Sequence, residues 1–467
     1  MSRIEKDFLG ERSLPDDIYY GVQTLRGKEN FTITGLPMSL EPTMIKAFGY
    51  VKKAAAKANM DCGALPENIA VPIMHACDLL IEGKYIDQFV TDFIQGGAGT
   101  STNMNANEVI ANLALELTGK KKGEYSFINP NDHVNCSQST NDTYPTALRL
   151  ALILRLEEYA ETLKKLKDAL AQKGKEFSRV LKMGRTHLQD AVPMSMGSEF
   201  QGFATTIGEE ITRITESRRL LREINLGATA IGTRVNTPPG YPELAVRYLA
   251  DMTCIDFMLA HDLVEATSDT GAYVQLSGVL KRTAVKLTKI CNDLRMLASG
   301  PRCGLNEIFL PQLQPGSSIM PGKVNPVIPE VVNQTSFLVI GLDTTVTLAA
   351  SAGQLQLNVM EPVISFALFT SLSTMQNAVK SLTENCVLGI RANEEHAKAM
   401  VMNSIGIITQ LTPILGYKQC ADIAREAFEQ NKSLHDIVVM EQQLLSQEKW
   451  DEVFSFENLI QPKYIKK

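Results

Sequence analysis

Residues 152–170 read LILRLEEYAETLKKLKDAL, and this stretch decides the fold class. Its apolar side chains are spaced alternately four and three residues apart, at Leu152, Leu156, Tyr159, Leu163, Leu166 and Leu170. That spacing places them along one face of an α-helix of about five turns. A stripe of this length predicts a long helix in a bundle rather than a short helix laid over a sheet.

The same periodicity returns later in the chain. Leucines recur every seven residues, each followed four places later by a small residue, at Leu280, Leu287, Leu294 and Ala284, Cys291, Ala298. Similar apolar patterns cover residues 194–225, 326–350 and 362–386, and shorter helical runs are expected at 43–60, 65–84 and 105–118. The pattern as a whole predicts an all-α protein built around a bundle of long helices.

Changes in composition divide the chain into three predicted domains. Residues 1–138 form a mixed, mostly helical N-terminal domain with frequent Gly and Pro. Residues 139–392 form the central long-helix bundle. A shift near Arg391 begins a small C-terminal helical domain, residues 393–467, made of short helices. The stripes alone would serve a structural helical protein equally well.

Composition excludes several classes of function. The chain is 44% hydrophobic and 21% charged with a net charge of −6 and no basic block, so nucleic acid is not expected as a partner. The N-terminus lacks the apolar core of a signal peptide and no uncharged run could span a bilayer, which predicts a cytoplasmic protein without a membrane partner. Eight scattered cysteines contain no Cys-x-x-Cys pair, and no His-Glu-x-x-His occurs. Free, mostly buried thiols and no metal site are therefore expected.

Four polar segments stand out, each expected immediately before a helix: residues 96–103, 137–142, 184–190 and 316–330. Helix N-termini carry unpaired N–H groups and a partial positive charge, so hydroxyls and amides gathered there suit a carboxylate ligand. Taken singly, each segment has a simpler explanation. The first is a glycine turn, the second a helix cap, the third a structural histidine and the fourth a surface lysine.

The fourth segment is the most unusual. Residues 316–326 read GSSIMPGKVNP and cannot be helical, because prolines lack an N–H and push the preceding residue toward extended geometry. Helix is expected to resume only after Pro329, with Glu330 in its first turn. A polar loop with glycine hinges before a helix is a common form of catalytic lid.

A nucleotide-binding P-loop is excluded for this segment. Five residues, rather than four, separate Gly316 from Gly322, and Val324 stands where a metal-binding hydroxyl is required. The preceding residues do not read as a strand.

Residues 316–326 instead resemble the signature of the fumarase/aspartase superfamily, and the other three polar segments match its remaining blocks in the same order, essentially end to end. Within the superfamily, the chain is most similar to the aspartate ammonia-lyases (aspartases). The deciding blocks are GGAGTS at 96–101, Ser139-Thr140, VIPEVVNQ at 327–334 and AGQLQLNVMEP at 352–362. Class II fumarases typically read TGSGTQ and Ser-Ser at the first two of these blocks.

The resemblance implies a reversible deamination of L-aspartate to fumarate and ammonia, with Cβ proton abstraction through an aci-carboxylate intermediate. It also implies a homotetramer whose central helices form a shared bundle and whose sites draw on three subunits. The heptad stripes agree with this, since exposed stripes require partners. No cofactor is expected, and activation by Mg²⁺ cannot be read from the sequence.

Three alternatives remain. Class II fumarase (fumarate hydratase) catalyses the same elimination with water leaving. Argininosuccinate and adenylosuccinate lyases typically carry Gln-Lys in place of Gly322-Lys323. A non-catalytic structural protein, as in the lens crystallins of the superfamily, is disfavoured by the complete polar set.

The resemblance also assigns roles to residues. The β-carboxylate would be bound by Ser139, Thr140, Thr186 and Ser318. The α-carboxylate would be held by Lys323 and Asn325, and the leaving amine would be surrounded by Thr100, Asn141 and His187. Ser317 would be the general base, its alkoxide stabilised by backbone N–H groups and Lys323, and Glu330 would orient His187.

One position departs from the family pattern Gly-Thr-Gly-Leu-Asn. Residues 232–236 read GTRVN, which puts Arg234 at the third position. A side chain there strains the turn if the backbone has a positive φ. A cation bordering the pocket would also change substrate preference.

Overall fold

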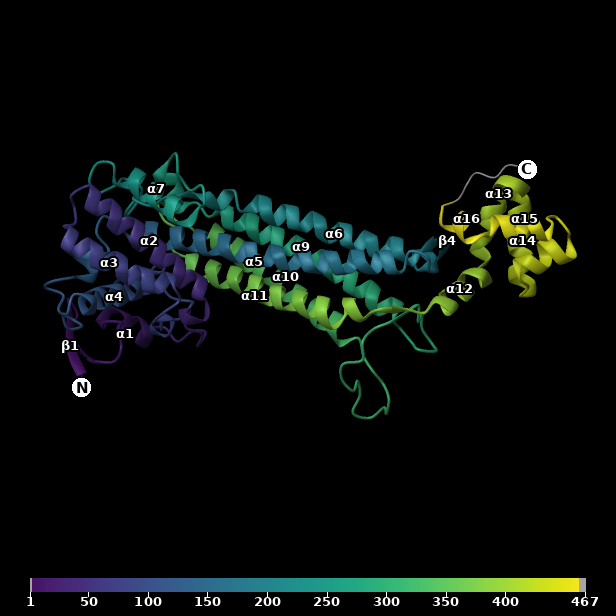
Figure 1. Ribbon diagram of the computed structural model, residues 1–467, viewed down its shortest axis with the longest axis horizontal. Coiled ribbons are helices and arrows are strands. Elements are labelled where there is room, and N and C mark those ends of the chain that lie inside the picture. Colours follow the sequence, from purple (N-terminus) through teal and green to yellow (C-terminus); the bar gives the residue numbers. More distant parts are fainter. Residues whose placement is uncertain (1, 462–467) are drawn as a thin grey trace. The chain divides into compact units, whose positions relative to one another are not determined.

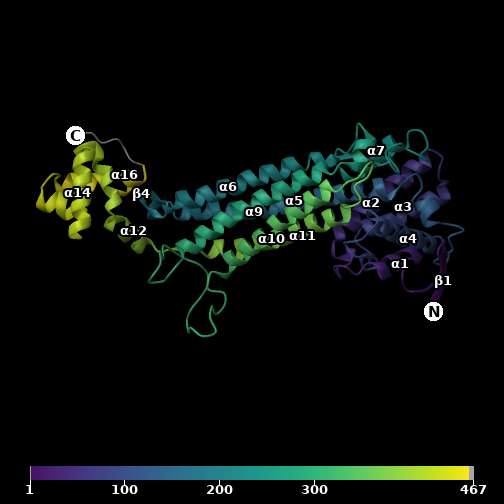
Figure 2. The same ribbon diagram turned by 180° about the vertical axis from the view of Figure 1, so that it is seen from behind.

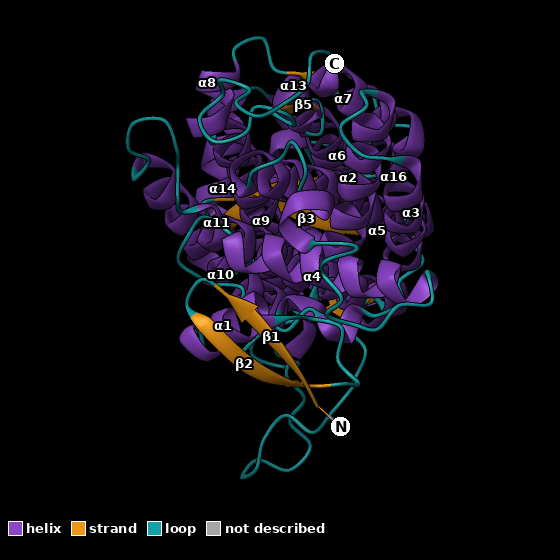
Figure 3. Ribbon diagram, turned by 90° about the vertical axis from the view of Figure 1, so that its left-hand side faces the viewer, coloured by secondary structure: helices purple, strands orange, loops and turns teal. Residues whose placement is uncertain are grey.

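The computed structural model describes residues 2–461, and helices dominate it (Figures 1 and 3). Its longest helices have 22 to 37 residues: α5 (Thr140–Glu176), α6 (Met196–Ser217), α9 (Gly271–Leu297), α10 (Val327–Ser351) and α11 (Glu361–Asn385). Each corresponds to a stretch of helical periodicity in the sequence. The prediction of an all-α fold is confirmed.

Two compact units make up the chain. Unit 1 comprises the chain up to Glu161 together with Ile211–Ala284 and Phe337–Met375. Unit 2 comprises Thr162–Glu210, Val285–Ser336 and the chain from Gln376 onward. The boundaries between the units fall inside the five long helices, so these helices contribute residues to both. The division into three domains at residues 138 and 392 stays a prediction.

Unit 1 contains the three shorter helices predicted from the N-terminal region, α2 (Pro42–Asp61), α3 (Glu67–Ile81) and α4 (Thr100–Leu117). It also contains three helices that were not predicted, α1 (Val22–Asn30), α7 (Tyr241–Thr253) and α8 (Leu263–Ser268). Helix α2 packs against α3 and α7, and α3 packs against α4. The strands form an antiparallel hairpin of β1 (Ser2–Asp7) and β2 (Gly10–Pro15), and a parallel pair of β5 (Glu223–Ile224) and β6 (Met258–Leu259).

Unit 2 carries two further strand pairs and the short C-terminal helices. Strands β3 (Leu181–Thr186) and β4 (Gln189–Ser195) form an antiparallel hairpin, and β7 (Ile308–Phe309) pairs with β8 (Arg391–Ala392). The helices are α12 (Glu394–Asn403), α13 (Thr412–Leu415), α14 (Tyr417–Gln430), α15 (Gln447–Val453) and α16 (Phe456–Ile460). Their core includes Leu181 and Met183 of β3 as well as Trp450.

Short 3₁₀ and π segments connect these elements. The 3₁₀ segments are Met38–Leu40, Ile86–Gln88, Leu220–Arg222, Val387–Gly389 and Ile405–Leu411, and the π segments are Pro130–Val134 and Asp436–Glu441.

The apolar stripe of α5 is buried at every position, from Leu152 to Leu170. In α9, Leu280, Leu287 and Leu294 are buried as well. The interpretation that these stripes are exposed and therefore require partner subunits is wrong, because this chain already covers them. Any apolar surface left for assembly must come from other side chains.

The described helices and thiols add two observations. None of these helices has both the length and the apolar character that crossing a bilayer demands. All eight cysteines are free thiols, four of them buried, namely Cys77, Cys291, Cys386 and Cys420.

Candidate active site

The segment between β7 and α10 forms a loop that extends away from the helix it enters (Figures 1 and 2). Its neck is closed by two hydrogen bonds. The backbone N–H of Gly316 donates to the carbonyl of Lys323 at 2.7 Å, and Asn325 Nδ2 donates to the carbonyl of Gly316 at 2.6 Å. A Cβ at Gly316 would meet the Asn325 nitrogen and the Lys323 oxygen, each at 2.7 Å. Glycine is therefore required for this neck to close.

Ser317 lies just inside the neck and accepts two backbone hydrogen bonds. Its Oγ receives the N–H of Ile319 at 3.2 Å and the N–H of Met320 at 2.9 Å. Two N–H groups aimed at one oxygen stabilise negative charge on it, as in an oxyanion hole. The same two N–H groups would also satisfy the hydroxyl oxygen of a neutral serine in a turn. The geometry therefore permits an alkoxide at Ser317.

The neighbouring residues of the loop face solvent. Ser318 and Lys323 are exposed. Within residues 2–461, the Lys323 ammonium has no hydrogen bond or ion pair to another side chain. It is therefore free to meet a carboxylate ligand.

Helix α10 begins at Val327, so the expectation that helix resumes only after Pro329 is wrong. Proline is tolerated in the first turn, because N–H groups there have no acceptor within the helix. Glu330 does lie in the first turn as predicted, and its N–H donates to the carbonyl of Pro326 at 3.2 Å.

The third polar segment was expected to precede a helix, but it forms the turn of the β3–β4 hairpin. Thr186 pairs with Gln189, which leaves His187 and Leu188 as a two-residue turn with φ of 56° and 62°. Such turns demand positive φ at both positions and normally use Asn or Gly, so this backbone is strained. Thr186 and His187 are both exposed at the tip of the hairpin.

The second polar segment caps α5. Ser139 Oγ accepts the N–H of Asn141 at 3.2 Å, while the N–H of Ser139 donates to Asp142 Oδ1 at 2.9 Å. This reciprocal arrangement is a capping box. Thr140 is buried, and its Oγ1 accepts a hydrogen bond from Asn103 Nδ2 at 3.2 Å. The cap and the candidate site therefore share the Ser139 hydroxyl.

The first polar segment lies against the second. Gly97, Ala98 and Gly99 all have positive φ, and Thr100 Oγ1 donates to the carbonyl of Gly97 at 2.7 Å. A Cβ at Gly99 would come within 2.3 Å of the Tyr144 ring on α5. Glycine at 99 thus allows this loop to pack directly on the start of α5, where the Ser139 cap lies.

A further loop, at residues 227–230, contacts the second polar segment, and this contact was not predicted from the sequence. Asp142 Oδ2 accepts the N–H groups of Gly227 and Thr229 at 3.0 and 2.9 Å, and Asn141 Nδ2 donates to the carbonyl of Ala230 at 2.7 Å. Burial raises the pKa of Asp142 to about 6. The turn at 232–236 follows this loop directly in the chain, two residues after Ala230, which accepts the hydrogen bond from Asn141.

Arg234 in that turn has a φ of 59°, which bears out the strain expected from its departure from glycine. Its side chain does not carry a free cation, however. Arg234 Nη1 lies 2.9 Å from Glu243 Oε1, in an ion pair that both partners expose to solvent.

Lys52 on α2 is a second residue that sequence reasoning missed. It is fully buried, and its Nζ donates to Asn135 Oδ1 at 3.0 Å and to Gln138 Oε1 at 2.9 Å. Burial lowers its pKa to about 7. The amine holds the turn that leads into Ser139. The sequence does not mark Lys52 as buried, because the neighbouring Lys53 is the same residue type in the same helical run.

The predicted site residues thus fall into two sets. Unit 1 contains Thr100, Ser139, Thr140 and Asn141, which the structure brings together. Unit 2 contains Thr186, His187, Ser317, Ser318, Lys323, Asn325 and Glu330. In the described part of the chain, no hydrogen bond or ion pair joins the side chains of His187 and Glu330.

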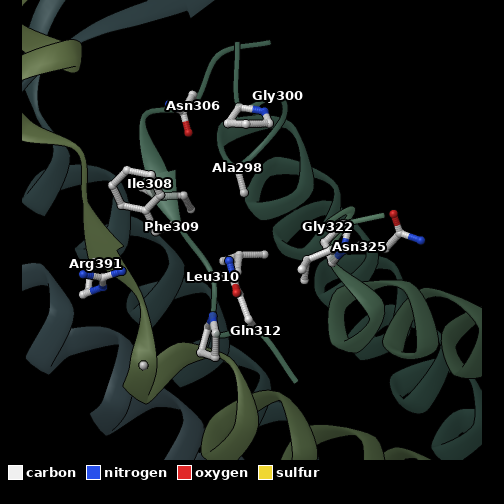
Figure 4. A pocket seen from close by; sticks show the side chains of 15 residues that line it. Ala298, Gly300, Asn306, Ile308, Phe309, Leu310, Gln312, Gly322, Asn325 and Arg391 are labelled. Atoms are coloured by element: carbon white, nitrogen blue, oxygen red, sulfur yellow. The ribbon is translucent and has the colours of Figure 1, made fainter. Parts of the chain in front are cut away.

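A pocket of about 460 Å³ lies beside the loop in unit 2. Figure 4 shows Gly322 and Asn325 of the loop across this pocket from Arg391. Of the predicted site residues, Asn325 alone lines it. This pocket therefore does not gather the predicted set.

Comparison with known proteins places the chain in a family. A family described as lyase matches residues 10–341, and one described as fumarase C C-terminus matches residues 407–461. The chain belongs to the fumarase/aspartase superfamily. Among its curated members, the aspartate ammonia-lyase of Helicobacter pylori is 56% identical over 465 residues, covering 100% of this chain and 99% of that protein. The aspartate ammonia-lyase of Escherichia coli is 54% identical over 463 residues, covering 99% and 97%.

Solved structures of the superfamily share the fold. The fumarate lyase:delta crystallin from Brucella melitensis bound to cobalt is similar with a TM-score of 0.95 and 50% identity, covering 98% of this chain and 99% of that one. The class II fumarase from Schistosoma mansoni is similar with a TM-score of 0.92 and 33% identity, covering 99% and 100%. The long-helix architecture is thus that of the superfamily.

Proposed function

We propose that this chain is an aspartate ammonia-lyase, which converts L-aspartate reversibly to fumarate and ammonia. One observation carries this conclusion. Curated aspartate ammonia-lyases from several bacteria are 53–56% identical to the chain over nearly their whole length. The class II fumarase structure is only 33% identical, so the ammonia-lyase is favoured over the hydratase.

The loop geometry suits the difficult step of this reaction, the removal of a proton from Cβ. Loss of that proton places charge on the β-carboxylate as an aci-carboxylate, so the site needs hydrogen-bond donors at those oxygens. We assign Ser317 as the base, because the N–H groups of Ile319 and Met320 already point at its Oγ. Exclusion of water around the loop would strengthen both interactions.

We further assign the substrate's groups as the family resemblance implies. Ser139, Thr140, Thr186 and Ser318 would bind the β-carboxylate, Lys323 and Asn325 the α-carboxylate, and Thr100, Asn141 and His187 the amine. One N–H of the Asn325 amide already donates to the carbonyl of Gly316, and its second N–H would donate to the α-carboxylate while the loop neck stays closed.

We propose a homotetramer with composite sites, in which His187 and Glu330 form their pair only after assembly. Support comes from α10, where Val331, Phe337, Leu338 and Leu348 are exposed. At 100° per residue they fall within a sector of about 120°. An exposed apolar side of a long helix favours packing against other helices. Sedimentation of the purified protein tests the assembly.

The decisive experiment measures the ultraviolet absorbance of fumarate formed from L-aspartate. Incubation with fumarate, with and without ammonium, separates the two elimination reactions: aspartate forms only with ammonium, whereas malate without ammonium would indicate a fumarase. We propose that no cofactor takes part, so turnover should survive a chelator. We also propose a cytoplasmic location, to be tested by cell fractionation.

A further inference from the structure

Four charged side chains form a network at the base of the β3–β4 hairpin. Glu307 is fully buried between two cations. Arg185 Nη2 lies 2.9 Å from its Oε1, and Lys182 Nζ lies 3.4 Å from its Oε2. Lys182 also donates to Glu199 Oε2 at 2.7 Å. The charges of two cations and two carboxylates thus cancel within this network in unit 2.

The Glu307 carboxylate is held by ion pairs rather than by well-aligned hydrogen bonds. In the described residues, no donor is aligned for a hydrogen bond to either of its carboxylate oxygens. A buried carboxylate is tolerated only beside its counter-charges, so Arg185 and Lys182 must stay where they are for Glu307 to remain buried. Arg185 is the residue before Thr186 and two before His187. The first arm of the hairpin is thereby anchored next to its turn.

The backbone around Glu307 is itself fixed by α12 and by Asn393, the residue that precedes it. The N–H of Asn393 donates to the carbonyl of Glu307 at 2.8 Å, and Asn393 Nδ2 donates to the carbonyl of Asn306 at 2.9 Å. His396 Nε2 lies 3.0 Å from the carbonyl of Leu305. Strand β7 follows directly and leads into the loop at residues 310–326, which carries Ser317 and is called the serine loop. Glu307 therefore ties the hairpin to the segment from which that loop departs.

The second arm of the hairpin is anchored independently. Asp190 Oδ2 accepts a hydrogen bond from Ser404 Oγ at 2.7 Å. Between the two anchors, His187 and Leu188 both hold positive φ angles, which are uncommon for residues other than glycine. Such strain persists only where the surroundings over-determine the conformation. The two anchors supply that constraint.

We propose that Glu307 is a positioning residue for the elimination: it holds Arg185, and through Arg185 the strained turn that presents Thr186 and His187 to the substrate. This role rests on the proposed function. Glu307 does not touch the substrate; its effect passes through the hairpin. Displacement of a substrate-contacting group by about 1 Å can cost roughly 100-fold in rate.

Enzyme kinetics with L-aspartate test this role in E307Q, a neutral variant of the same shape. E307Q should lose about 10–100-fold in kcat/KM, as expected for a displaced substrate-contacting group. H187N removes the imidazole but keeps a residue that tolerates positive φ. Because Glu307 acts through the turn, the loss in E307Q/H187N should be smaller than the product of the two single losses. The matched control is E199Q, which removes the other carboxylate on Lys182 and leaves the Arg185–Glu307 pair in place.

A second readout does not depend on turnover. Amide hydrogen exchange across residues 181–195 should accelerate in E307Q but not in E199Q, with the β1–β2 hairpin as an internal reference. If E307Q does not fold, E307D, which keeps the charge but shortens its reach, takes its place. Unchanged exchange in the hairpin, equal effects of E199Q, or losses that simply multiply would overturn the role. If the wild type forms no fumarate, the proposed function fails. The exchange data would still show whether Glu307 fixes the β3–β4 hairpin.

Discussion

Asn325 closes the neck of the serine loop by donating its side-chain amide to the carbonyl of Gly316 at 2.6 Å. The same amide is our candidate for the α-carboxylate of the substrate. Its NH₂ group carries two N–H donors, so one can stay on Gly316 while the other donates to the carboxylate. The closed neck therefore holds the Asn325 amide in place for substrate binding.

The neck can be tested at Gly316. G316A places a methyl group 2.7 Å from two backbone atoms, so the neck must open. We expect kcat to fall by about tenfold or more, since loop geometry positions Ser317. The melting temperature should hardly change, because the loop is largely exposed. G322A is the control: its Cβ meets open space, at a cost of about 1 kcal/mol for its positive φ, so its kcat should fall less.

Lys323 is exposed and has no side-chain partner among residues 2–461, as expected of a group that binds a ligand. K323A should raise KM for L-aspartate by roughly tenfold or more, because it removes a charge-assisted contact to a carboxylate. Folding should be unaffected, as judged by the melting temperature. K418A, which removes an exposed lysine of α14, should leave KM unchanged. An unaltered KM in K323A would count against its role.

The turn at Arg234 yields a prediction about stability. At a φ of 59°, glycine is favoured over any residue with a Cβ. We therefore expect R234G to be more stable than R234A by about 1 kcal/mol in denaturant unfolding. Both variants lose the exposed pair with Glu243, so that contribution cancels. Equal stability of the two would show that the turn is not strained.

Glu361, at the start of α11, makes stability depend on pH. Burial raises the pKa of its carboxyl to about 8 from an ordinary value of 4.5, against the opposing effect of Arg149. Between these values the folded protein holds a proton that the unfolded chain releases, so the free energy of unfolding falls as pH rises. This one group contributes a slope of about −1.4 kcal/mol per pH unit. In E361Q, the free energy of unfolding should fall less steeply between pH 5 and 8. An unchanged slope would exclude the Glu361 carboxyl as its source.

The long helices could be predicted because their apolar residues have a clear period. Leu152 to Leu170 are buried as the pattern implies, and α2 and α3 lie where helical runs were expected. The β3–β4 hairpin could not be predicted in the same way. Its turn is His187-Leu188 rather than Asn-Gly, and Gly184 and Pro193 interrupt the strands, so no local hairpin signal exists.

The candidate site was predictable only in part. Ser139 and Thr140 fit a helix cap and a carboxylate site equally well, and the structure shows that the cap is real. Lys52 and Asp142 support that segment from within the core, yet burial of a charged residue has no local sequence signature. Glu307 escaped notice for the same reason: its partners lie more than 100 residues away in the chain.

The central claim is that the Ser317 hydroxyl is the base. The most direct measurement compares S317A with the wild type, following fumarate formation from L-aspartate and binding of fumarate in parallel. We predict that kcat falls by several orders of magnitude while fumarate still binds, because only the group that takes the proton is lost. Turnover by S317A at the wild-type rate would contradict the account.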